Sequence, residues 1–206
     1  MANILSLSKP LTLYVNLHFT VDKHRKEQLK KRRIALQKEL DRKQMRAAIS
    51  SRIAFLERSG YAYSLYYESE NLNWIVNNLS IRKKDGYKGL HDDFQVDVHD
   101  ADAPEAVSIN DVRFLADALP ADFLSGRQDE TYLAVCYLGG DPELEIPATA
   151  FFSDPEVFFS GFETWMITAE KDWMMEYIRE QNVIRCIKLD GTRPVLAKNI
   201  IVQATG

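Results

Sequence analysis

Cysteine is scarce in this chain. Its 206 residues include two cysteines, Cys136 and Cys186, and both lie inside apolar runs. Two cysteines are too few for a disulfide scaffold, and buried free thiols behave as small hydrophobic residues. The cysteine content therefore predicts a protein of a reducing compartment, the cytoplasm.

Long apolar runs are also missing. No stretch approaches the roughly 18 to 20 apolar residues that a helix needs to cross a bilayer. The amino-terminal segment before Pro10 contains a single Lys and no basic region ahead of an apolar one. A secretory signal peptide would show such a region and a small-residue cleavage site. We expect neither a signal peptide nor a membrane partner.

The motifs of common catalytic sites are absent as well. The chain has no Gly-x-Ser-x-Gly, His-Glu-x-x-His or P-loop pattern, so conventional hydrolases and nucleotide-dependent enzymes are not indicated. Neither cysteine has a neighbouring cation that would clearly lower its pKa, except that Arg185 adjoins Cys186. We predict no catalytic residue and no cofactor, although a triad assembled from distant residues would leave no such motif.

The composition is that of a globular protein with a strongly uneven charge. Hydrophobic residues make up 46% and charged residues 27% of the chain, enough for a real core. Residues 23–58 contain 13 Lys and Arg against 4 Asp and Glu, which leaves 13 basic and 26 acidic residues elsewhere. The first region has a net charge of +9 and the remainder a net charge of −13. This separation is the most informative feature of the sequence.

The amino-terminal quarter of the chain predicts a strand followed by a long helix. Apolar and polar residues alternate over residues 11–19, which is the period of a half-buried strand. No Gly or Pro then interrupts residues 21–59, where we expect one basic helix that ends at Gly60. Such a helix would be about 55 Å long.

The rest of the chain predicts an α+β body with a mainly antiparallel sheet, because hairpin patterns dominate over alternating strand–helix units. We expect residues 1–60 to form a strand and helix, and residues 61–206 a body that could be continuous with them. The expected strands are residues 61–67, 74–82, 94–99, 131–138, 164–168, 183–189 and 195–202, and the expected helices are residues 108–119, a helix that begins near residue 153, and residues 169–181. We expect residues 74–82 and 94–99 to pair through a loop that contains Asp85 and Gly86, and residues 183–189 and 195–202 to form a hairpin.

The two halves of the long helix differ in their apolar content. Met45, Ile49, Ile53 and Leu56 form a stripe that can pack on the body, whereas the first half offers only a narrow apolar seam. We predict that this seam and its cations, together with tyrosines that follow the helix, bind a protein partner. The predicted partner-binding residues are Leu29, Leu36, Leu40, Lys30, Lys31, Arg32, Arg33, Tyr63 and Tyr66.

A nucleic-acid partner is the first alternative. Cations along a helix can contact phosphates without sequence preference, and the candidates are Arg25, Lys26, Lys30, Arg33, Lys38, Arg42, Lys43 and Arg46. Consecutive cations ring the helix, however, and aromatic residues for base stacking are absent between Val21 and Ala54. These features weaken the nucleic-acid hypothesis.

A metal-dependent enzyme is the second alternative. His91, Asp97 and His99 lie in an acidic stretch, and imidazole with carboxylate is usable ligand chemistry. Their spacing matches no common metal motif. The hypothesis that the sequence favours is a non-enzymatic interaction protein, such as an inhibitor, an immunity-type factor or an accessory subunit. Its partner would be a protein, with homo-oligomers expected.

Overall fold

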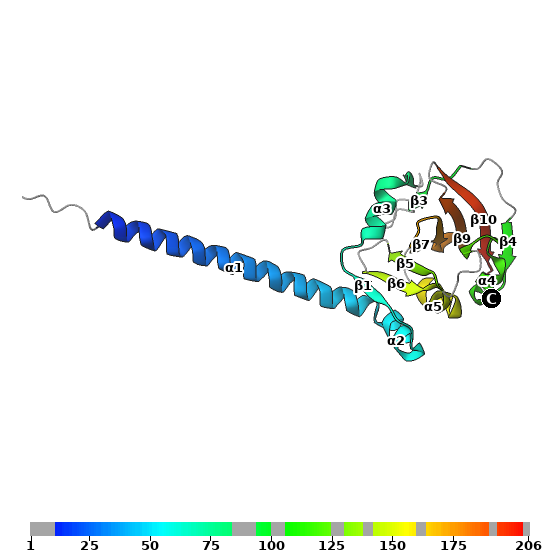
Figure 1. The fold of residues 1–206 in the computed structure, drawn as a ribbon, viewed down its shortest axis with the longest axis horizontal. Helices are drawn as coiled ribbons and strands as arrows, with labels where there is room; N and C mark the ends of the chain where they lie inside the picture. Colours follow the sequence, from blue (N-terminus) through cyan, green and yellow to red (C-terminus); the bar gives the residue numbers. More distant parts are fainter. Residues whose placement is uncertain are drawn as a thin grey trace, which may run out of the picture. The chain divides into compact units, whose positions relative to one another are not determined.

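The structure is a computed structural model, and its backbone is described for residues 11–83, 94–99, 106–124, 130–137, 142–159, 164–189 and 193–203. The chain divides into two units, Met1–Gln44 and Met45–Gly206. The first unit contains most of one helix, and the second contains a sheet with helices on both faces (Figure 1). The α+β class and the mainly antiparallel sheet predicted from the sequence are confirmed.

Helix α1 (Leu11–Ala48) begins earlier than expected. The strand predicted over residues 11–19 is wrong, because these residues form the first turns of α1. A strand needs a partner for its backbone N–H and C=O groups, whereas a helix satisfies them within the segment. The predicted helix over residues 21–59 is also not continuous: its backbone leaves helical geometry at Ile49 (φ −106°, ψ 19°) and resumes as α2 (Ser50–Ser59).

Helix α2 packs on the body through the stripe that the sequence predicts. Ile49, Ile53 and Leu56 are buried, and the Phe55 ring meets Phe158 edge-on at 5.9 Å between centroids. The helix ends at Gly60, whose φ of 73° is left-handed. Only a residue without a Cβ adopts this conformation at no steric cost, so Gly60 stops the helix.

The main sheet has eight strands in the order β1-β6-β5-β7-β8-β9-β10-β4. All neighbours pair antiparallel except β10 and β4, which are parallel. The carboxyl-terminal hairpin and the strands near residues 64, 132 and 164 agree with the sequence prediction. The strands are β1 (Ser64–Tyr66), β4 (Ala106–Ile109), β5 (Tyr132–Tyr137), β6 (Glu143–Pro147), β7 (Thr164–Thr168), β8 (Trp173–Ile178), β9 (Val183–Leu189) and β10 (Pro194–Val202).

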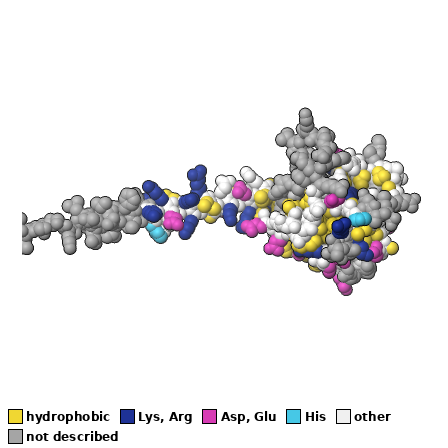
Figure 2. All heavy atoms as spheres, turned by 90° about the horizontal axis from the view of Figure 1, so that it is seen from above, with side chains coloured by type: hydrophobic (Ala, Val, Ile, Leu, Met, Phe, Trp, Pro, Cys, Tyr) yellow, Lys and Arg dark blue, Asp and Glu magenta, His cyan; other side chains and the backbone are white. Residues whose placement is uncertain are grey.

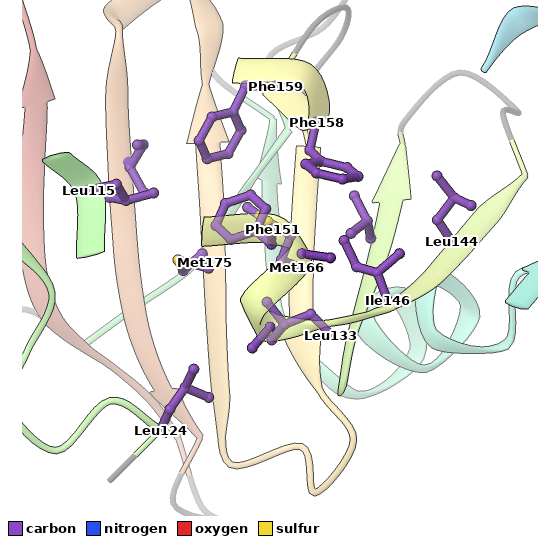
Figure 3. Packing of buried hydrophobic residues seen from close by; sticks show 14 of the residues in the cluster. Leu115, Leu124, Leu133, Leu144, Ile146, Phe151, Phe158, Phe159, Met166 and Met175 are labelled. Carbon is purple, nitrogen blue, oxygen red and sulfur yellow. The ribbon is translucent and has the colours of Figure 1, made fainter. Parts of the chain in front are cut away.

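Both faces of the sheet are covered by apolar side chains. On one face, α2, α5 (Ala148–Ser153) and α6 (Pro155–Phe159) cover the sheet, and Phe151, Phe158 and Phe159 lie over Met166 and Met175 (Figure 3). On the other face, α3 (Glu70–Asn78) and a short second sheet cover Trp165 and its neighbours. Figure 1 shows α3 and α5 on opposite sides of β5 and β6.

The second sheet pairs β2 (Ile81–Lys83) with β3 (Phe94–Val96). This pairing agrees with the hairpin expected from residues 74–82 and 94–99, but residues 74–78 belong to α3 and not to a strand. Ser69 explains the difference, because its hydroxyl accepts the N–H of Leu72 and caps a helix there. The turn expected at residues 85–86 lies outside the described residues.

The helix expected at residues 169–181 is wrong, since Trp173–Ile178 is the central strand β8. The hydroxyl of Thr168 accepts the N–H groups of Asp172 and Trp173 and closes a tight hairpin from β7. The helix expected at residues 108–119 is shorter than predicted. It begins with a 3₁₀ turn (Val112–Phe114) capped by Asp111 and ends as α4 (Leu115–Ala118), and its first residues belong to β4.

The helix expected near residue 153 is present as α6, which follows the short helix α5 directly. Within the described parts of the chain, no helix combines the length and the apolar content that a bilayer crossing requires.

Candidate functional site

The described part of α1 carries a narrow line of exposed leucines. Leu29, Leu36 and Leu40 are 59%, 53% and 54% exposed. At about 100° per residue these three side chains fall within about 40° of one another around the helix. Ile34, which is 50% exposed, lies roughly 120–160° from all three. The predicted seam is therefore one line of three leucines, which we call the leucine seam.

Basic side chains surround this seam on every side of the helix. All the cations predicted for partner or nucleic-acid binding are exposed, and Figure 2 shows Lys and Arg side chains (dark blue) on both sides of the described part of α1. From the same helical geometry, Lys26 and Arg33 lie on one flank of the seam, about 40–60° from its centre, whereas Lys31 and Lys38 lie about 160–180° from its centre. The exposed predicted cations are Arg25, Lys26, Lys30, Lys31, Arg32, Arg33, Lys38, Arg42, Lys43 and Arg46.

Two ion pairs involve cations of the described part of α1, one of them with Arg46, which lies 4.0 Å from Glu57 of α2. Lys43 pairs with Glu39 one turn earlier at 2.9 Å, and both side chains are largely exposed. Such i,i+4 pairs contribute about 0.3–0.5 kcal/mol and do not neutralise the segment. One basic residue counted in the sequence does not belong to the exposed set: Arg52 is buried, with its guanidinium 4.0 Å above the Tyr137 ring.

The two predicted tyrosines belong to the second unit, at β1. Tyr63 is partly buried and its hydroxyl donates to Glu57 at 2.9 Å. Burial and this carboxylate raise the pKa of Tyr63. Tyr66 is 40% exposed on the edge strand. The Tyr63 hydroxyl is thus hydrogen-bonded within the body, whereas the Tyr66 side chain is accessible to solvent.

Two of the three predicted metal ligands come together. Asp97 and His99 follow β3 and line one hollow of about 530 Å³, which Arg193 also lines. His91 lies outside the described residues. Among the residues that the structure describes, no three His, Cys, Asp or Glu side chains are placed to hold a metal ion. The hollow combines one carboxylate, Asp97, with one guanidinium, Arg193.

Two buried carboxylates were not predicted from the sequence. Glu143 of β6 is 1% exposed and accepts from the Ser69 hydroxyl at 2.5 Å, the Asn71 side chain at 2.7 Å and the Asn71 backbone N–H at 3.1 Å. These donors lie at the amino end of α3, where the helix dipole favours a negative charge. Glu143 therefore fixes α3 on the sheet.

Glu176 of β8 is the second buried carboxylate, with no exposed surface. One oxygen accepts from the Val96 N–H at 2.9 Å and the Trp165 indole at 3.0 Å, and the other accepts from Arg185 at 2.5 Å. Arg185 also donates to the Val96 carbonyl at 3.1 Å. Burial raises the pKa of Glu176, an effect that the Arg185 charge opposes. This network ties β3 to the main sheet and has a structural role.

Neither cysteine has the lowered pKa or the exposed thiol that nucleophilic chemistry requires. Cys136 and Cys186 are free and buried. Burial raises the pKa of Cys186 to about 12, and burial together with the charge of Glu143 raises the pKa of Cys136 well above its usual range. Arg185, the one neighbouring cation in the sequence, is engaged with Glu176.

No protein-family model, curated protein or solved structure matches this chain. The arrangement of its own residues is therefore the basis for any function, and the described part of α1 carries an exposed surface with a defined pattern.

Proposed function

We propose that this protein is a protein–protein interaction module, in which the leucine seam of α1 binds an acidic amphipathic helix of a partner protein. The observation that supports this proposal is the combination of three aligned, exposed leucines with a cationic surround. A partner helix with apolar residues at its centre and carboxylates on its flanks would complement both features.

The apolar contribution comes from the seam itself. Fully burying a leucine side chain contributes about 1.5–3 kcal/mol, and each seam leucine is slightly more than half exposed. Covering the exposed part of each would contribute about 1 kcal/mol. Three such contributions give weak binding on their own, so charge must supply the rest of the affinity and the specificity.

The charge pattern favours an acidic partner over a second copy of α1. Residues 23–44 contain ten basic and three acidic side chains. Pairing two such seams would bring like charges together on both flanks, in either orientation, and like charges at these positions oppose association. Carboxylates at the flanking positions of a partner helix would instead steer and stabilise the complex.

A nucleic acid would use the same cations in a different way. Phosphate contacts require positive charge but no apolar seam, and cations on every side of a helix would contribute similarly. The position of the cations relative to the seam therefore separates the two functions. Binding that depends on the seam-flanking cations more than on the opposite ones indicates a helical protein partner.

The experiment measures the affinity of the full chain for a designed acidic peptide, with Leu at the a and d positions and Glu at the e and g positions of its heptads. Leu36→Gln is compared with Ile34→Gln, because both residues are about half exposed but lie on different faces. Lys26→Gln/Arg33→Gln is compared with Lys31→Gln/Lys38→Gln, because both pairs remove the same charge.

We expect Leu36→Gln and the flanking pair each to weaken binding about tenfold, corresponding to about 1.4 kcal/mol. The matched controls should change binding by less than about threefold. Equal losses in both charge pairs, together with tight binding of single-stranded DNA that weakens steeply between about 50 and 200 mM salt, would assign the helix to nucleic acid. A dimer in light scattering that Leu36→Gln abolishes would replace the acidic partner by a second copy.

A further inference from the structure

Two adjoining hollows lie on the body where α3 ends and β10 begins. One has a volume of about 530 Å³ and the other about 210 Å³, and Asn78, Arg193 and Pro194 line both. The larger volume is within the usual range for small-molecule sites, about 300–1,000 Å³. Both belong to the unit Met45–Gly206, so they are separate from the leucine seam.

Backbone hydrogen bonds between distant segments hold the lining in place. The Asp97 N–H donates to the Ser80 carbonyl at 2.7 Å, and the His99 N–H donates to the Pro194 carbonyl at 3.0 Å. The Leu189 N–H donates to the carbonyl of Asp172, next to Lys171, at 2.8 Å. Segments far apart in the sequence therefore meet here as a connected wall.

The two hollows offer different chemistry. The smaller one has an apolar side, with Trp74, Leu79 and Leu189, and two cations, Lys171 and Arg193. The larger one is polar, and its hydrogen-bonding side chains are Asn78, Ser80, Asp97, His99 and Arg193. A planar ring fits the apolar side, an anionic group fits the cations, and hydroxyl groups fit the polar side.

Lys171 is held in an unusual conformation at this place. Its φ is 57°, in the left-handed region, within the hairpin that joins β7 to β8. Its ammonium group lies 4.9 Å from the centroid of the Trp74 ring. Lysine is seldom found at such a φ, which glycine adopts without strain, and strained residues cluster at functional sites. Lys171 thus presents a cation in the lining of the smaller hollow, beside Trp74.

We infer that these hollows bind a small organic anion of the mononucleotide class, with its base against Trp74, its phosphate on Arg193 and Lys171, and its sugar hydroxyls toward Asp97 and Ser80. A nucleotide joins a planar ring, hydroxyl groups and a phosphate within one molecule, which is the combination that the lining offers. The inference is independent of the function proposed for α1.

The test titrates the full chain with AMP, adenosine and inorganic phosphate by calorimetry. We expect AMP to bind at least tenfold more tightly than adenosine or phosphate, because each of these lacks one half of the recognition. Arg193→Ala should reduce AMP binding to the level of adenosine. AMP should also quench the fluorescence of Trp74, and Trp74→Phe should remove this quenching, because Trp165 and Trp173 are buried.

Two further variants separate binding from folding. Lys171→Gly removes the cation and relieves the positive φ, so it should weaken AMP binding at least fivefold without lowering the melting temperature. Lys188→Ala is the matched control, because Lys188 also lies over a tryptophan, at 5.5 Å from Trp173, but lines neither hollow. It should leave AMP binding unchanged. Absence of AMP binding, AMP affinity no higher than that of phosphate, or an unchanged affinity in Arg193→Ala would each overturn the inference.

Discussion

Removing one member of the Glu176–Arg185 pair should destabilise the body strongly. Glu176→Gln is the sharpest perturbation, because the Val96 and Trp165 donors bind one carboxylate oxygen and Arg185 binds the other. Glutamine can keep the first oxygen as an acceptor and replaces the second by an amide nitrogen. The variant therefore removes the ion pair and preserves the two neutral hydrogen bonds.

The expected magnitude follows from the burial of both side chains. Glu176 is fully buried and the Arg185 side chain is 11% exposed, so neither charge becomes solvated when its partner is removed. Breaking a buried pair in this way costs about 3–5 kcal/mol. Arg185→Met should have a similar cost, and the double variant should cost about 2–3 kcal/mol less than the sum of the two.

The cost of Arg185→Met should also depend on pH. Burial raises the pKa of Glu176 above its ordinary value of 4.5, and Arg185 lowers it. Without Arg185 the folded-state pKa rises further. A raised pKa contributes stability below the unfolded-state value that is lost as the pH rises through the folded-state value. Arg185→Met should therefore be most harmful at neutral pH and least harmful below about pH 4.5.

The assay is equilibrium unfolding in urea for the four proteins of the cycle. Lys188→Met is the control, because Lys188 and Asp122 form an exposed pair at 3.0 Å that should be worth less than about 1 kcal/mol. Single variants that each cost less than 1 kcal/mol, or a double variant whose cost equals the sum, would show that Glu176 and Arg185 do not form a buried ion pair that stabilises the body.

Three further predictions concern single positions. Cys136 and Cys186 should not react with Ellman's reagent in the native protein and should both react in denaturant, because burial raises both thiol pKa values. The Asp111 carboxyl should titrate by NMR at about pH 2, since hydrogen bonds from Arg113 lower its pKa, and Arg113→Ala should move the midpoint toward 3.8. Because folding depresses the Asp111 pKa, the cap should weaken as the pH falls through about 2. Gly60→Ala should cost about 1 kcal/mol in thermal unfolding, because of its left-handed φ.

The sequence predicted the α+β class and most of the antiparallel pairing because those signals are local. Apolar runs bounded by turn residues identified β5, β7 and the β9–β10 hairpin, and the stripe from Ile49 to Leu56 identified the packed helix. In each case the residues of the segment alone show the apolar pattern that its burial requires.

Two segments were misassigned because their neighbours decide their structure. Trp173–Ile178 mixes residues suited to either helix or strand, and pairing with β7 on one side and β9 on the other makes it a strand. Residues 11–19 alternate like a strand, yet all eight strands of the main sheet come from residues 64–202. None of the described strands pairs with residues 11–19, and helix formation satisfies the backbone within the segment.

The two candidate surfaces also differ in whether the sequence alone predicts them. The leucine seam could be read from spacing alone, because residues on one helix have fixed relative positions. The wall that joins Trp74, Lys171 and Arg193 could not, because it is assembled from the ends of five separate segments. Buried carboxylates such as Glu143 likewise look like surface residues until their donors are placed around them.

Amide hydrogen exchange with and without the acidic heptad peptide tests the role of α1 most directly. We expect the peptide to slow exchange within residues 23–44 of the wild-type chain and of Ile34→Gln, and much less in Leu36→Gln. Protection confined to residues 45–203, or equal protection in Leu36→Gln, would contradict it.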